Sequence, residues 1–260
     1  MDEVSLKSER NIERRKFIKR VVTFLASLIF PGILGSKEKR DTGEVWIIGD
    51  GYNPREHYWG MGIKINKCIG CGRCVDACKK ENNVPLEPFF YRTWVEQYLI
   101  FEGGESPDGG IQGFEKRAHE KNIIRSFFVP KLCNQCDNPP CVQVCPVGAT
   151  FKVDDGVVLV DSEYCIGCRY CIQACPYGAR FLHPETHTAE KCTFCYHRIV
   201  KGLVPACVEV CPTQARIFGD IKKRASPLVR FVRMHKIRVL KPYLNTEPKV
   251  FYADLDMEVK

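Results

Sequence analysis

The sixteen cysteines of this 260-residue chain stand in four groups of four, with none left over. The groups are Cys68, Cys71, Cys74 and Cys78; Cys133, Cys136, Cys141 and Cys145; Cys165, Cys168, Cys171 and Cys175; and Cys192, Cys195, Cys207 and Cys211. Three of the four closing cysteines are followed by a proline, at Pro146, Pro176 and Pro212. Any fold of this chain has to bring these thiols together in a way that explains their regular grouping.

The spacing C-x2-C-x2-C-x3-C, which groups one and three share, is typical of cubane [4Fe–4S] clusters. Three thiolates from one tight turn bind three irons of one cube, and in two-cluster ferredoxins the fourth cysteine reaches the neighbouring cluster. The sequence therefore predicts four [4Fe–4S] clusters, with iron bound through all sixteen cysteines.

Two other uses of cysteine stay open. A disulfide scaffold is one, although such scaffolds are usually much shorter than this chain. Zinc is the other, because the C-x2-C-x11-C-x3-C spacing of group four alone is compatible with paired zinc knuckles. The x2 and x3 spacings followed by proline are not typical of zinc ribbons.

The groups repeat as longer modules. Segments 141–149, 171–179 and 207–215 match one another, and 74–78 is a shorter fourth copy with Lys79 in place of the proline. Such repetition implies duplicated units. We expect each unit to have a cluster loop and then a short helix that the Cys-Pro step opens. A β-hairpin should turn at Asp154-Asp155-Gly156.

The quoted groups, in this order, resemble the four-cluster electron-transfer subunit of the DMSO reductase and polysulfide reductase family, over about residues 59–219. The resemblance implies an α+β fold with two bacterial-type 2[4Fe–4S] ferredoxin-like units. The outer unit would comprise residues 59–83 and 185–219, and the inner unit residues 128–184. The resemblance also implies that group one pairs with group four, and group two with group three.

This pairing assigns a ligand set to each cluster. Cluster 1 would take Cys68, Cys71, Cys74 and Cys211, and cluster 2 would take Cys192, Cys195, Cys207 and Cys78. Cluster 3 would take Cys133, Cys136, Cys141 and Cys175, and cluster 4 would take Cys165, Cys168, Cys171 and Cys145. No cysteine then remains as a nucleophile, and no histidine spacing or phosphate loop indicates a substrate site. We therefore expect no catalytic residues.

Residues 1–36 are predicted to be an export signal or a retained N-terminal anchor. Arg14-Arg15, followed by Phe17, resembles the twin-arginine signal, a route that carries folded cargo. The apolar stretch 21–34 is shorter than the ~18 residues of a spanning helix. The alternative is an amphipathic basic segment that only touches a membrane. We expect the chain in the periplasm or peripheral on the outer face of the cytoplasmic membrane.

Two segments lie outside the minimal ferredoxin units. Residues 84–127 are predicted to form an inserted β-hairpin, with an aromatic strand at 89–102, a return partner at 123–129 and a loop rich in Gly, Asp and Pro at 103–121. This hairpin would either dock a partner or shield a cluster. Residues 220–260 are a basic C-terminal extension, which we expect to wrap a partner.

The net charge of +8 is uneven. Residues 1–40 and 220–260 each carry ten basic against five acidic side chains, which leaves −2 for the remainder. The cluster region is therefore not basic, and nucleic acid is not an expected partner. Seven cations near the cysteines either tune cluster potentials or face solvent: Lys79, Lys80, Lys131, Arg169, Arg180, Lys191 and Arg198.

These features predict an electron-transfer subunit of an oxidoreductase complex. Its partners would be an integral-membrane quinone-interacting subunit of the polysulfide-reductase type and a multihaem cytochrome or molybdopterin catalytic subunit. Three assemblies fit the resemblance: a molybdopterin reductase for polysulfide, thiosulfate or tetrathionate, an exported [NiFe]-hydrogenase, and the membrane complex associated with dissimilatory sulfite reduction. The export signal, the length and the lack of a C-terminal anchor favour the O subunit of the third slightly. A stand-alone periplasmic ferredoxin is a further alternative.

Overall fold

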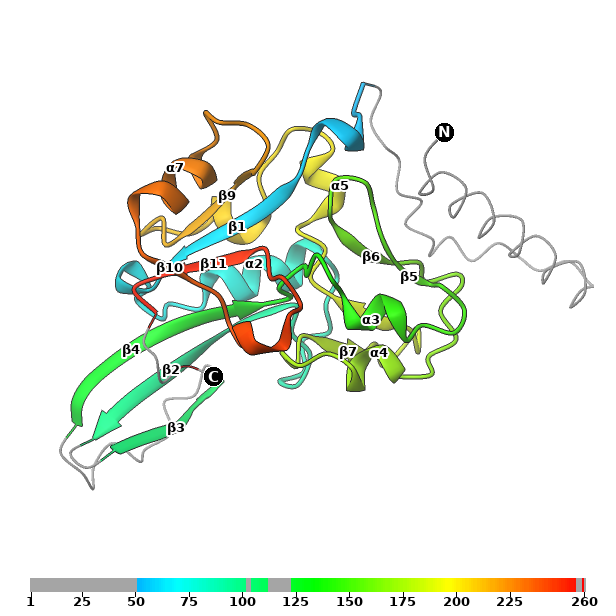
Figure 1. Cartoon of the computed structure of the whole chain (residues 1–260). Coiled ribbons are helices and arrows are strands. Elements are labelled where there is room, and N and C mark those ends of the chain that lie inside the picture. Colours follow the sequence, from blue (N-terminus) through cyan, green and yellow to red (C-terminus); the bar gives the residue numbers. More distant parts are fainter. Residues whose placement is uncertain (1–50, 102–103, 112–122, 256–258, 260) are drawn as a thin grey trace, which may run out of the picture. The chain divides into compact units, whose positions relative to one another are not determined.

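The computed structural model describes residues 51–101, 104–111, 123–255 and 259 (Figure 1). The predicted signal segment 1–36 lies outside them. The elements mix short helices and strands, as the predicted α+β class requires. They are η1 (Pro54–Glu56), β1 (Trp59–Lys64), η2 (Ile65–Lys67), α2 (Arg73–Glu81), β2 (Thr93–Phe101), β3 (Gly104–Ile111), β4 (Ile123–Leu132), α3 (Pro140–Gln143), β5 (Thr150–Lys152), β6 (Val158–Val160), α4 (Tyr170–Gln173), β7 (Arg180–Leu182), β8 (Ala189–Lys191), α5 (Tyr196–Ile199), α6 (Ala206–Glu209), β9 (Arg216–Asp220), α7 (Pro227–Met234), β10 (Ile237–Arg238), η4 (Pro242–Leu244) and β11 (Val250–Ala253).

A four-stranded sheet of order β10-β11-β1-β9 joins distant parts of the chain. β1 pairs antiparallel with β9, so that Met61 faces Phe218, and parallel with β11, so that Met61 also faces Val250. The expectation that the extension 220–260 wraps a partner is therefore wrong for these strands. Apolar residues of the extension, including Val250 and Tyr252, are fully buried in the core of their own chain.

Helix α7 covers this sheet where β1 presents two glycines. A Cβ atom on Gly62 of β1 would stand 2.5 Å from the ring of Phe231, and one on Gly60 would stand 2.9 Å from Leu228. Leu228 and Phe231 are buried, whereas Val232 on the same helix is exposed. Glycines in β1 thus let the helix backbone approach closely. None of the helices in the described residues is long and apolar enough to cross a membrane.

The hairpin predicted around Asp154-Asp155-Gly156 is confirmed. β5 and β6 pair antiparallel, with Phe151 opposite Leu159. Gly156 adopts a left-handed φ of +82°, and the Asp155 side chain accepts from the N–H of Val157. β7 and β8 form the equivalent two-stranded sheet after the next cysteine group.

The short helices do not begin at the Cys-Pro steps, so that expectation is wrong. α3, α4 and α6 each contain the third cysteine of a group and end two residues before the fourth. A proline directly after the fourth cysteine has no N–H and cannot continue the ladder. α2 differs because Lys79 follows Cys78, and it runs on to Glu81.

The inserted segment contains one strand more than expected. β2 pairs with β4 from Thr93↔Leu132 to Phe101↔Ile123, which confirms the two predicted strands. β3 lies in the predicted loop and pairs with the other edge of β2, in a register with two irregularities. Backbone hydrogen bonds suffice for an edge strand, and Pro107 is tolerated there. Val95 and Pro130, at the base of this sheet, line the first cysteine cavity described below.

Candidate iron–sulfur sites

The first Cys-x-x-Cys turn of each group contains a residue in the left-handed region, directly before its second cysteine. The φ angles are +69° at Gly70 and Gly167, +47° at Gln135 and +57° at Phe194. Glycine adopts this conformation without a steric penalty, whereas glutamine and phenylalanine do not. Gln135 is held in place because its side chain is fully buried, donates to the Cys192 carbonyl at 2.6 Å and accepts from Val158 N at 2.7 Å.

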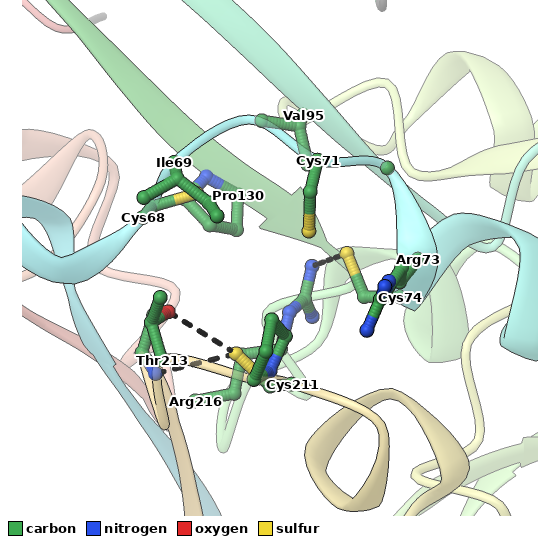
Figure 2. A pocket seen from close by; sticks show the side chains of 13 residues that line it. Cys68, Ile69, Cys71, Arg73, Cys74, Val95, Pro130, Cys211, Thr213 and Arg216 are labelled. Carbon is green, nitrogen blue, oxygen red and sulfur yellow. Dashed lines mark hydrogen bonds between the residues drawn. The ribbon is translucent and has the colours of Figure 1, made fainter.

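The first cavity is lined by Cys68, Cys71, Cys74 and Cys211, the set predicted for cluster 1 (Figure 2). Cys68 follows η2, Cys71 lies in the loop before α2, and Cys74 lies in the first turn of α2. Cys211 lies between α6 and β9. Burial alone would raise the pKa of Cys211, but the Thr213 hydroxyl and the N–H of Ala215, 3.3 Å away, lower it by hydrogen bonding.

The second cavity is lined by Cys78, Cys192, Cys195 and Cys207, the set predicted for cluster 2. All four are buried. The Asn82 amide donates to the sulfurs of Cys78 and Cys195, each at 3.6 Å, and accepts from Arg92 at 3.0 Å. The last cysteine of group one thus lies with group four, while the last cysteine of group four lies with group one.

The inner pair of sets is connected through electrostatic contacts. The pKa of Cys136 rises to about 12, chiefly through burial and then through Cys133, Cys141 and Cys175, which are the partners predicted for cluster 3. Cys165 and Cys171 pack in one cluster of side chains with Cys141. Cys145 accepts from Thr150 N at 3.5 Å. The inclusion of Cys145 and Cys168 in the fourth set stays a prediction.

The cavities fit a polynuclear cluster. Burial is the main reason that the pKa of Cys192 rises to about 12 and that of Cys207 to about 11. Such thiols lose their protons only to a strong counter-charge, which iron supplies. Buried Thr193 Oγ1 and Arg216 Nη1 also have no partner among the described residues, as donors facing cluster sulfur would.

The four sets stand in a linear order. Burial is the main reason that the pKa values of Cys207, Cys192 and Cys171 are raised. A thiol of an adjacent set raises each of these pKa values further: Cys74 acts on Cys207, Cys133 on Cys192, and Cys141 on Cys171. These contacts connect set 1 to 2, 2 to 3 and 3 to 4. Two cysteines are exposed: Cys71, which lines the first cavity, and Cys168, which is predicted to belong to the last set.

A buried cation lies at each of these three junctions. Arg216 interacts with Cys74 and Cys207, Lys191 with Cys133 and Cys192, and Arg180 with Cys141 and Cys171. Lys191 and Arg180 are among the cations expected near the cysteines from the sequence, whereas Arg216 is not. The missed signal is the repeat, because an Ala-Arg pair follows the fourth cysteine in both group three and group four.

The other cations named from the sequence form ion pairs or hydrogen bonds elsewhere, or face solvent. Lys131 lies 2.5 Å from the Glu96 carboxylate, and Arg198 donates to Glu81 at 2.9 Å. Lys79 donates to three backbone carbonyls of the segment after α2. Lys80 and Arg169 are exposed.

Comparison with known proteins identifies the domains. Two models described as 4Fe-4S dicluster domain match residues 67–149 and 124–221. Together they span all sixteen cysteines, which fit four [4Fe–4S] clusters. The chain therefore carries two ferredoxin-like dicluster units and four [4Fe–4S] clusters.

Similar whole proteins are iron–sulfur or B subunits of reductases. The tetrathionate reductase B subunit of Salmonella typhimurium is 47% identical over 78% of this chain and 75% of its own length. The protein of the same name from Archaeoglobus fulgidus is 47% identical over 74% and 80%. The putative dimethyl sulfoxide reductase iron-sulfur B subunit of Halobacterium salinarum is 38% identical over 76% and 80%. The chain belongs to the family of iron–sulfur electron-transfer subunits of molybdopterin reductases.

Proposed function

We propose that this chain relays electrons between a quinone-linked membrane subunit and a molybdopterin catalytic subunit that reduces an oxidised sulfur compound of the tetrathionate type. One observation gives the main support for this proposal. With Cys168 in the fourth set as predicted, the cysteine sets form a line whose two middle sets are almost wholly buried, while each end has one exposed cysteine. Electrons can therefore enter and leave at the ends, and the protein insulates the middle.

The substrate class rests on the relatives. Two tetrathionate reductase B subunits, from a bacterium and an archaeon, are each 47% identical to this chain. The slight preference for the complex associated with sulfite reduction, drawn from the sequence, is therefore replaced by the molybdopterin alternative. The direction proposed is from the membrane subunit through the clusters to the catalytic subunit.

The test is to purify the complex anaerobically from its host by a tag on this chain. We expect molybdenum in the purified complex, and re-oxidation of dithionite-reduced clusters when tetrathionate is added. Arsenate, selenate and dimethyl sulfoxide serve as competing oxidants. The isolated chain is the control, and tetrathionate should not re-oxidise it. Haem without molybdenum would instead support the sulfite-associated complex, and a chain that purifies alone would support a free carrier.

We also propose that residues 1–36 direct export by the twin-arginine route, because Arg14-Arg15 precede an apolar stretch. Replacing both arginines by lysine keeps the charge and should leave the cluster-loaded protein in the cytoplasm. Cell fractionation checks this. Undiminished export of the double variant would contradict it.

A further inference from the structure

Arg180 and Arg216 occupy equivalent places in the internal repeat. Each follows an alanine that stands four residues after the last cysteine of its group, at Ala179 and Ala215. Each is the first residue of a strand, β7 or β9. Their exposed fractions are only 5% and 3%. Burial of a guanidinium is costly unless it is paired, so both positions need an explanation.

The two arginines make the same pair of contacts. Arg180 donates to the Cys141 sulfur at 3.1 Å and to the Thr150 hydroxyl at 3.3 Å. Arg216 donates to the Cys74 sulfur at 3.4 Å and to the Thr93 hydroxyl at 2.8 Å. In both cases the sulfur belongs to the third cysteine of the group that pairs with the arginine's own group. Figure 2 shows the Arg216 guanidinium reaching the Cys74 sulfur at the first cavity.

The countercharge of these arginines is sulfur. Among the described residues, neither guanidinium has a carboxylate partner. Burial works against their charge, but nearby cysteines raise the pKa of both: Cys74, Cys207 and Cys192 for Arg216, and Cys141, Cys133 and Cys171 for Arg180. Each arginine thus faces two cysteine sets at once.

We propose that Arg180 and Arg216 are fixed positive charges, one in each ferredoxin-like unit, that raise the reduction potentials of the two clusters they adjoin. Arginine stays protonated in proteins, so this charge does not depend on pH. Reduction adds one electron to a cluster and breaks no bond. A buried cation stabilises the added negative charge, because screening is weak in the interior. The inference rests on the clusters and not on the identity of any partner.

The experiment compares Arg216→Gln, Arg180→Gln, the matching lysine variants and Arg224→Gln, an exposed arginine that controls for net charge. Each isolated protein is loaded with clusters, its iron is counted, and its clusters are titrated by EPR-monitored reduction. Both Gln variants should keep four clusters, with at least a tenfold fall in the reduction equilibrium of adjoining clusters, about 59 mV for one electron. The lysine variants should recover most of the shift, and Arg224→Gln should show none.

The affected signals should differ between the variants. Arg216→Gln should shift the clusters that Cys74→Ser or Cys207→Ser alter, and Arg180→Gln those that Cys141→Ser or Cys171→Ser alter. Unchanged potentials in loaded Gln variants would overturn the proposal. Loss of iron from both the Gln and Lys variants would also overturn it, since the arginines would then be structural. Because no partner is present, neither result bears on the proposed reductase.

Discussion

The position of Cys78 distinguishes two possible ligand assignments: with its own group, or with group four. Its position in sequence puts it with Cys68, Cys71 and Cys74, but helix α2 carries its side chain to the other cavity. Cys78 stands four positions after Cys74, so the two thiols leave the helix about one turn apart. The two cavities thus show for the outer pair of groups the exchange of fourth cysteines that the family resemblance implies.

Serine variants test this pairing. Cys78→Ser should alter the same cluster signal as Cys195→Ser, because both residues line the second cavity. Cys211→Ser should alter the same signal as Cys71→Ser, since both line the first. Each change should convert or remove one cluster of four, as measured by iron content and EPR. A Cys78→Ser protein that matches Cys71→Ser would contradict the crossover.

At the residue scale, the sequence predicts most about the cysteines, because few chemical roles fit their number and spacing. Sixteen thiols with cluster spacing allow few other uses, and the family resemblance supplied their grouping. Arg216 could not be placed next to Cys74, because 142 residues separate them and no local pattern connects them. Only the repeated Ala-Arg pair pointed to it, and only when Arg180 was compared with Arg216.

At the scale of elements, helix length follows from a single residue. The groups with a proline after the fourth cysteine have four-residue helices, whereas α2, with Lys79 there, has nine residues. Lys79 also holds the following segment, since its ammonium donates to the carbonyls of Pro85, Leu86 and Glu87 at 3.0–3.1 Å.

Lys79→Ala should therefore loosen residues 85–91 while the helix persists, since alanine is a strong helix former. We expect faster hydrogen exchange and proteolysis within this segment. Lys80→Ala is the matched control, because Lys80 is the exposed neighbour on the same helix. Equal protection in the two variants would show that the three hydrogen bonds contribute nothing.

The contact of α7 with the glycine face of β1 gives a second prediction. Leu228→Ala removes a fully buried side chain and should destabilise the loaded protein by about 2–5 kcal/mol. The measurement is denaturant-induced loss of cluster absorbance under anaerobic conditions. Val232→Ala, at an exposed site of the same helix, should change stability by less than about 0.5 kcal/mol. Similar losses in both would contradict the packing.

Strand prediction succeeded for β2 and β4, whose aromatic and β-branched residues favour extended structure. It failed for β3, which contains three glycines and a proline and pairs with the edge of β2. Long-range pairing also explains why β11 was missed, since Val250 meets Met61 from 189 positions away in the chain. Local patterns do not contain such information.

At the scale of the whole molecule, the clusters replace part of the hydrophobic core. Eight of the sixteen cysteines are buried, and several belong to the main group of core side chains, so an empty site leaves polar thiols in the interior. Ligand bonds to iron also fix loops that packing alone would not hold.

Removal of iron by an anaerobic chelator should therefore unfold most of the chain. We expect circular dichroism to lose most of its helical and strand signal as the clusters bleach. Reloading with iron and sulfide should restore the signal. An iron-free protein that keeps native dichroism and hydrogen-exchange protection would show that packing alone specifies the fold.

β11 lies between β10 and β1, and its Val250 pairs with Met61, which lines the cavity of Cys78. During translation, the outer sheet therefore lacks an interior strand until residues 250–253 have been made, which is after the last of the sixteen cysteines. The cysteines of the inner pair have all been made by Cys175. The order of synthesis therefore allows the inner clusters to be assembled while the chain is still growing. The sheet beside the outer pair is completed only later, when β11 has been made.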